Sequence, residues 1–211
     1  MAAKNNVVLS TFYKCKDGKF ITIVSKETEG AKKLPPNKNG KIYYYLPFTN
    51  LVSTLVGLSI EKQEWEGNEW EVLNVKLDDS KEREILQVNL ESNEAVNILS
   101  RLGNLETYDI TKTIEVGIML NEDKFNFCYI RQNGQSIKSI FKQDNPLPKW
   151  KEIKVKGKKS LWDKTDQTEV LKKIVEKINT ILKVDTTAEI KNPLTGIDDL
   201  NGFEIDEEIG F

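Results

Sequence analysis

Short runs of alternating apolar and polar residues recur along most of the chain, and a period of two is typical of β-strands with one buried face. A hairpin is predicted around residues 66–68, and Asn133-Gly134 is the strongest two-residue hairpin signal in the sequence. The predicted strands span residues 20–24, 41–48, 60–65, 70–77, 84–90, 111–120, 125–132 and 135–141. Residues 51–58 fit a short helix or a continuing strand, and residues 149–164 allow one more strand.

The same alternation predicts which side chains face the core. In residues 41–48 the predicted core set is Ile42, Tyr44, Leu46 and Phe48, and the predicted wet set is Lys41, Tyr43 and Tyr45. In residues 70–77 the set that shares a face is Leu73, Val75 and Leu77, so Trp70 and Lys76 point the other way. In residues 111–120 the predicted inward set is Ile114, Val116, Ile118 and Leu120.

Two stretches change to a helical period. Residues 92–103 begin with Ser92, a favoured N-cap residue, and stop at Gly103. Asp166 is expected to cap a second helix, whose apolar positions recur at helical spacing as far as Leu182. Many short strands, two helices and no regular alternation of strand with helix predict a mainly β domain, a small closed barrel with added helices.

Composition excludes several classes of chemistry. The chain of 211 residues has no histidine, so it holds neither a Ser-His-Asp nor a Cys-His nucleophile pair, and its two cysteines cannot close a zinc site. We expect Cys15 and Cys128 to be free thiols. Glycine-rich phosphate loops are absent, and a calcium loop centred on Gly202 would have Ile197 as its first ligand, so no cofactor or metal is expected. No apolar run reaches membrane-spanning length and the N-terminus lacks a signal-peptide pattern, so we expect an intracellular, cytoplasmic protein.

Charge divides the chain into two parts. Residues 184–211 hold eight acids and one base, a net charge of −7, and are predicted to form a disordered acidic tail. Residues 1–183, the predicted domain, hold 25 acids and 30 bases, a net charge of +5. Such a tail can compete with a polyanion for the basic domain or present itself to a partner protein. A merely solubilising tail is the plainer interpretation, but such a tail has no use for the terminal aromatic Phe211.

Basic and aromatic residues are interleaved in residues 124–164, which carry a net charge of +8. Cations that neutralise phosphates beside flat side chains that stack bases are typical of a groove for single-stranded nucleic acid. The opposite interpretation is that many of these aromatic residues fill a barrel core and that the lysines only solvate it. The candidate DNA-binding residues are Lys41, Tyr43, Tyr45, Trp70, Lys76, Phe127, Tyr129, Arg131, Lys138, Lys142, Trp150, Lys151 and Lys154.

The chain resembles the single-stranded-DNA-binding proteins of bacteriophages, the group with one OB-fold per chain. The resemblance rests on the acidic tail with its terminal Phe and on a body pattern covering about half the chain. The residues of that pattern are Phe125 through Asn133-Gly134, Lys142, Asn145-Pro146, Trp150 and Trp162-Asp163. The resemblance implies an OB-fold-like Greek-key barrel that coats single-stranded DNA in replication and recombination, cooperatively or as a homodimer.

It also implies that the tail recruits a polymerase, helicase or primase and weakens DNA binding when folded back. The tail residues expected to do so are Asp198, Asp199, Glu204, Asp206, Glu207, Glu208 and Phe211. Ile205, Ile209 and Gly210 interrupt the acids, a departure that bears on the strength of the competition.

Two other functions remain open at this point. The first is a structural or adaptor protein without a DNA role, whose tail docks a partner. The second is a metal-dependent nuclease that uses the densest acids of the domain. Those acids are Asp78, Asp79, Glu82 and Glu84, for which a charged turn between two strands is the plainer explanation.

Overall fold

The computed structural model describes residues 10–24, 26–36, 40–78, 83–154 and 160–183, and these residues are mainly β. The predicted acidic tail, with the residues assigned to partner binding, lies outside the described residues, as do Asp79 and Glu82. The described strands are β1 (Ser10–Lys16), β2 (Lys19–Val24), β3 (Lys32–Lys33), β4 (Tyr44–Phe48), β5 (Asn50–Trp65), β6 (Asn68–Asp78), β7 (Arg83–Asn89), β8 (Thr113–Leu120), β9 (Asn126–Gln132), β10 (Gln135–Ser136), β11 (Lys151–Ile153) and β12 (Leu161–Asp163). The helices are α1 (Asn93–Leu102) and α2 (Thr165–Leu182).

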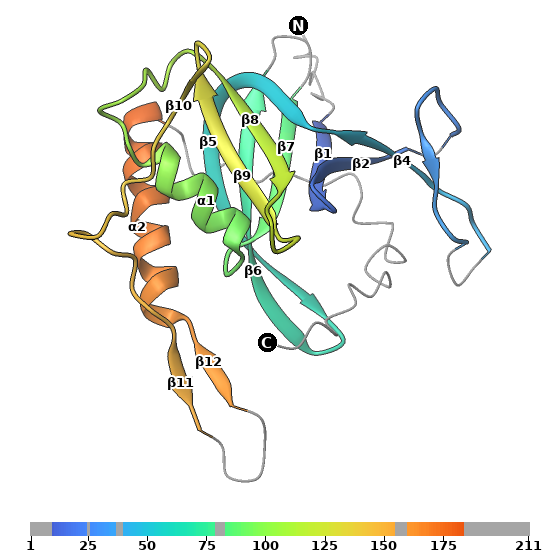
Figure 1. Cartoon of the computed structure of the whole chain (residues 1–211). Helices are drawn as coiled ribbons and strands as arrows, with labels where there is room; N and C mark the ends of the chain where they lie inside the picture. Colours follow the sequence, from blue (N-terminus) through green and yellow to red (C-terminus); the bar gives the residue numbers. More distant parts are fainter. Residues whose placement is uncertain (1–9, 25, 37–39, 79–82, 155–159, 184–211) are drawn as a thin grey trace, which may run out of the picture.

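Ten of these strands form one mixed sheet in the order β10-β9-β8-β5-β6-β7-β1-β2-β4-β3 (Figure 1). Only the pair of β1 and β7 is parallel among the pairs described. The sheet is open, so the prediction of a closed barrel is wrong. The sequence pattern missed β1, which pairs with the edge of β7 and continues the sheet through β2, β4 and β3.

Three tight turns fix the register of the hairpins. Asp17-Gly18, Glu66-Gly67 and Asn133-Gly134 each have two consecutive residues with positive φ, between +48° and +81°, as a type I′ turn requires. The predicted hairpin at residues 66–68 and the Asn133-Gly134 turn are therefore confirmed. The strand predicted at residues 135–141 is wrong beyond Ser136, because the chain leaves β9 after two residues of pairing.

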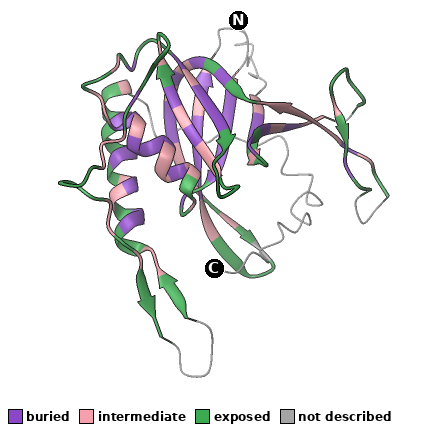
Figure 2. Ribbon diagram, in the orientation of Figure 1, coloured by how far each residue is buried: buried purple, intermediate pink, exposed green. Residues whose placement is uncertain are grey.

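The core lies between the inward side of the sheet and the two helices, which Figure 1 shows together on one side. Figure 2 shows its buried residues concentrated in the central strands and on the facing sides of α1 and α2. Ser92 caps α1 as predicted, since its side chain accepts a hydrogen bond from the Ala95 amide, and Gly103 ends the helix. Asn179 of α2 exchanges two hydrogen bonds with the backbone of Leu58 in β5, at 2.8 and 2.9 Å, which fixes the helix against the sheet.

The first hairpin also contacts the far end of the sheet. The Gly18 amide donates to Asn126 Oδ1 at 2.7 Å, and Asn126 Nδ2 donates to Glu94 of α1 at 2.9 Å. Cys15 and Cys128 are free thiols, as predicted, and lie close enough that hydrogen bonding with Cys128 and burial raise the pKa of Cys15. The sheet therefore curls so that β1 approaches β9 although the two strands are not paired.

Several local predictions need correction. Residues 51–58 belong to the single long strand β5, so the helix alternative is wrong and the continuing strand is confirmed. Leu120 is exposed, because the end of β8 runs past the core, while Ile114, Val116 and Ile118 are buried as predicted. The N-cap of α2 is Lys164, and Asp166 lies in the first turn. No described helix combines the length and the apolar character that crossing a membrane requires.

Candidate nucleic-acid interface

One side of the sheet carries polar and cationic side chains where it faces away from the helices. Alternation along β5, β6, β7 and β1 sends one set of side chains into the core and the other set outward. We call the outward set the outer face. It comprises Ser59, Glu61, Trp70, Val72, Asn74, Lys76, Asp78, Arg83, Ile85, Gln87, Phe12 and Lys14, so two acids lie among its three cations. Trp70 and Lys76 lie opposite Leu73, Val75 and Leu77, which confirms the predicted division of β6.

A row of polar residues crosses this face from strand to strand. The register aligns Ser59 with Asn74, Asn74 with Gln87, and Gln87 with Lys14. Gln87 Nε2 donates to Asn74 Oδ1 at 2.9 Å, and Asn74 Nδ2 donates to Ser59 Oγ at 3.4 Å. Asn74 and Gln87 are only 2% and 8% exposed, and Val72 and Ile85 beside them are 5% and 1% exposed, so the row is buried. Buried amides can donate to and accept from a ligand that reaches them.

The row ends on one cation, Lys14, and two more cations, Lys76 and Arg83, lie beside it on the outer face. Desolvation by burial lowers the pKa of Lys14 and of Lys76. At Lys76 the charge of Glu61 acts in the opposite direction and raises the pKa, while Arg83 lowers it further, so Lys76 and Arg83 lie within electrostatic reach of each other. Arg83 Nε is buried without a hydrogen-bond partner within the described part of the chain. Asp78 pairs with Arg83 in register across β6 and β7.

The predicted aromatic residues of this region divide into half-buried and fully buried positions. Trp70 of β6 and Tyr45 of β4 are both half-buried. Tyr45 lies on the same side of the sheet as Lys14, because Tyr45 pairs with Ile23 and Lys14 pairs with Ile21, two residues on one face of β2. Tyr43 is only 4% exposed, so its prediction as a solvent-facing stacking residue is wrong. It precedes β4, where strand alternation no longer applies, and its ring lies under the ammonium of Lys41 at 4.8 Å.

The predicted residues of β9 occupy a different part of the sheet, separated from β6 by β8 and β5. The Tyr129 ring lies against Gly117, where a Cβ atom would meet Tyr129 Cζ at 2.1 Å. The Arg131 guanidinium lies 4.6 Å from the centre of that ring and 3.9 Å from Glu115. Phe127 is covered by the guanidinium of Arg101, 4.9 Å from its ring centre. These rings are therefore already in contact with cations of the protein.

The remaining candidates lie neither on the outer face nor on β9. Lys138 and Lys142 are exposed in the segment that follows β10. Trp150 donates from Nε1 to Gln167 at 2.8 Å and lies beneath the Lys164 ammonium at 4.4 Å, at the base of the β11–β12 hairpin. The list of sequence candidates thus combines residues from three separate places. Lys14, Arg83, Asn74 and Gln87 of the outer face were not predicted from the sequence. The Asp17-Gly18 dipeptide, a hairpin signal, could have indicated that a strand precedes it, whereas no sequence signal places Arg83 on the outer face.

The alternative nuclease site gains no support from the described residues. Glu84 is buried in β7, where it accepts hydrogen bonds from Tyr13 and Ser53, so it serves the packing of β1 against β7 and β5. Within the described ranges, no three cysteine or acidic side chains gather closely enough to hold a metal ion.

Comparisons with protein-family models, curated proteins and solved structures found no significant match. Any functional inference therefore depends on the geometry of the interface and on the sequence.

Proposed function

We propose that the protein binds single-stranded DNA, without sequence preference, on the outer face. The observation that carries the proposal is the polar row of Ser59, Asn74, Gln87 and Lys14, flanked by Lys76 and Arg83. The amides of the row and the cations beside them would suit a chain of unpaired bases joined by phosphates. Trp70 and Tyr45 supply flat surfaces on the same side of the sheet for stacking.

We further propose that β5 to β9 with α1 form a variant of the OB-fold. In support, β5, β6 and β7 form an antiparallel meander, α1 follows β7, and β8 returns beside β5 with β9 next to it. The OB-fold has this strand connectivity, and it binds oligonucleotides on the face of its second and third strands. Those strands correspond to β6 and β7, which carry Trp70, Asn74 and Gln87. The departure is β1, which lies beside β7 where the fifth OB strand would close the barrel.

Two interactions would drive this binding: the neutralisation of phosphates by cations and the stacking of bases on aromatic rings. Lys14, Lys76 and Arg83 would release counterions from three phosphates, which gives log K a slope of about −2 against log salt concentration for a single strand. A stacked ring adds ~1–3 kcal/mol per base and tolerates every base. The Watson–Crick edges of duplex bases are paired with each other and cannot bond to the amides of the row. Single strands should therefore bind more tightly than duplex.

We propose the same cellular role for the chain as the sequence resemblance implies, the coating of single-stranded DNA during phage replication and recombination in the host cytoplasm. Residues 198–211 would recruit a replication protein and compete with DNA for the three cations. The support is their charge, six acids without a base, opposite in sign to that of the outer-face cations.

The test is a titration of labelled oligo-dT and of a matched duplex, by fluorescence anisotropy at several salt concentrations. Lys76→Gln should lower the affinity for oligo-dT and reduce the salt slope by about 0.7. Lys173→Gln removes one exposed cation from α2 and serves as the matched control, with affinity and slope expected to equal those of the wild type. Equal affinity for duplex, a flat salt dependence or an equal loss in the control would refute the proposal.

A further inference from the structure

The chain holds two cysteines, and they lie on strands that are far apart in the order of the sheet. Cys15 belongs to β1 and Cys128 to β9, with β8, β5, β6 and β7 between them. Cys128 is fully buried in the core, and Cys15 is half-buried against it. Two thiols placed in this way approach each other only because the sheet curls back on itself.

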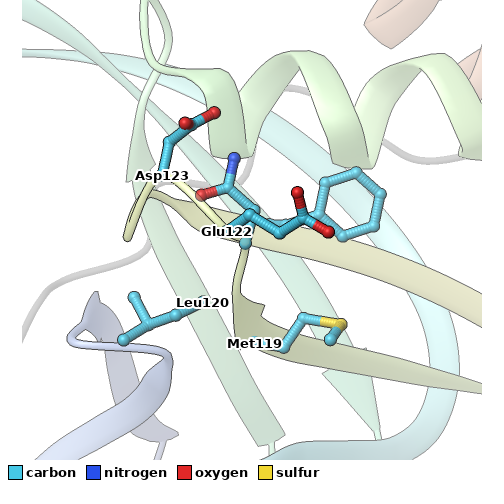
Figure 3. Close-up of a pocket in the computed structure, with 6 residues that line it drawn as sticks. Met119, Leu120, Glu122 and Asp123 are labelled. Atoms are coloured by element: carbon cyan, nitrogen blue, oxygen red, sulfur yellow. The ribbon is translucent and has the colours of Figure 1, made fainter.

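The turn of the β1–β2 hairpin makes the contact that closes the curl. The Gly18 amide donates to Asn126 Oδ1 at 2.7 Å, and a Cβ atom at Gly18 would lie 2.9 Å from Leu120 Cγ. Figure 3 shows Leu120 beside this turn, which is drawn in pale blue. Leu120 and Asn126 are direct partners in the pairing of β8 with β9. The first hairpin is therefore seated on the end of the β8–β9 hairpin by a hydrogen bond and by close packing.

Both cysteines lie a few residues from this contact and on the core side of their strands. Cys15 is three residues before Gly18, and Cys128 is two residues after Asn126. Cys15 pairs in register with Phe20, which is fully buried, so its side chain points to the same side as that ring. The two thiols are in contact, because hydrogen bonding with Cys128, together with burial, raises the pKa of Cys15.

Two thiols in contact are the reactants of a disulfide. We propose that Cys15 and Cys128 form a redox-active pair, which hydrogen peroxide oxidises to a disulfide that joins β1 to β9. The Cys128 thiolate attacks one peroxide oxygen, the O–O bond breaks, and the hydroxide that leaves takes up a proton to become water. The Cys15 sulfur then attacks the sulfenic acid, the S–O bond breaks, and the second hydroxide takes the Cys15 proton. Two thiols and one peroxide thus give one disulfide and two water molecules.

The surroundings assign different roles to the two sulfur atoms. Besides hydrogen bonding and burial, the negative charges of Cys128 and Glu94 raise the pKa of Cys15, so Cys15 keeps its proton as the resolving thiol. Burial lowers the pKa of Arg101 and the charge of Cys128 acts in the opposite direction, so this guanidinium lies within electrostatic reach of Cys128. A neighbouring cation favours a thiolate, which makes Cys128 the attacking sulfur. β1 and β9 share no backbone pairing among the described residues, so a local opening at the Gly18 contact admits peroxide.

The test is oxidation of the full-length chain, without DNA, by one equivalent of hydrogen peroxide, followed by alkylation and mass spectrometry. The product should have lost two hydrogen atoms, take no alkyl label and yield a linked pair of peptides that contain Cys15 and Cys128. Non-reducing electrophoresis should show a single chain, and dithiothreitol should restore both thiols. Because the disulfide closes a loop of roughly 110 residues, the oxidised chain should melt at least about 5 °C above the reduced chain.

The matched control moves one thiol without changing the number of cysteines. Cys15→Ser/Lys16→Cys places the thiol at the exposed neighbouring position, on the other side of β1, and should form no disulfide within the chain. Circular dichroism melting of the reduced variant checks that its fold is intact. A wild-type chain that keeps both thiols under conditions that oxidise glutathione would overturn the proposal. So would disulfides formed only between chains, an oxidised chain with unchanged Tm, or a control that closes as readily as the wild type.

Discussion

The hydrogen bond between Gln87 and Asn74 gives the sharpest test of the polar row. Leucine at position 87 has nearly the volume of glutamine but no donor, so Gln87→Leu leaves the Asn74 oxygen buried without its 2.9 Å partner. An unsatisfied buried polar group costs ~1–3 kcal/mol, and we expect the free energy of unfolding to fall by that amount. For a domain of this size each kcal/mol lowers Tm by ~2–4 °C. The double variant Asn74→Leu/Gln87→Leu removes both partners, and Ser59 retains Glu61 as an acceptor at 3.3 Å.

Replacement of both partners by apolar groups of similar shape is close to neutral. The double variant should therefore be less destabilised than the sum of the two single variants, by ~1–2 kcal/mol. Urea unfolding measures this difference when the m-values agree. Gln87→Leu, Asn74→Leu and the double variant should all bind oligo-dT more weakly, because the row loses polar groups proposed to contact the bases. A neutral Gln87→Leu variant, or strictly additive effects, would show that the row is not a desolvated hydrogen-bonded unit.

Two further predictions concern aromatic residues and the C-terminal segment. Tyr43→Ala should lower the free energy of unfolding by ~3–5 kcal/mol, as replacement of a core aromatic residue does. Trp70→Ala and Tyr45→Ala should each weaken oligo-dT binding by ~1–3 kcal/mol with smaller changes in Tm, and equal losses of stability and affinity in all three variants would contradict the assignment. Deletion of residues 198–211 should tighten oligo-dT binding most at low salt, where charges are least screened, and unchanged affinity at both low and high salt would exclude competition between this segment and DNA. Removal of Phe211 alone should leave DNA affinity unchanged and weaken docking to a replication protein.

Alternation predicted β6 and β8 because the apolar residues of their inner face recur at every second position. Leu73, Val75 and Leu77 of β6 and Ile114, Val116 and Ile118 of β8 follow a strict period of two, so both strands and their faces were correctly predicted. β1 shows no such period, since adjacent Phe12 and Tyr13 are both buried, one on each side of the sheet. A strand covered on both faces gives a weak alternating signal. Its parallel pairing with β7 is a long-range contact that no local pattern encodes.

The candidate interface was predicted only in part for the same reason. Trp70 and Lys76 could be assigned to the outer side from the period of β6 alone. Lys14 and Gln87 belong with them only because β1, β7 and β6 are adjacent, which is a property of the strand order. The net charge of +8 over residues 124–164 suggested one groove. Its described residues are instead divided among β9, the segment after β10 and the β11–β12 hairpin, because proximity in sequence does not imply a common face once the chain leaves β10.

The most direct test of the central claim is to map where a single strand contacts the protein. Ultraviolet cross-linking to thymidine oligonucleotides, followed by mass spectrometry of the peptides, locates the contacted side chains. We predict adducts on Trp70 and Tyr45 and on the β1 and β6 peptides that carry Lys14 and Lys76, with competition by unlabelled single strand and little by duplex. Adducts confined to β9 or to the β11–β12 hairpin, with none on β1 or β6, would contradict the assignment of the outer face.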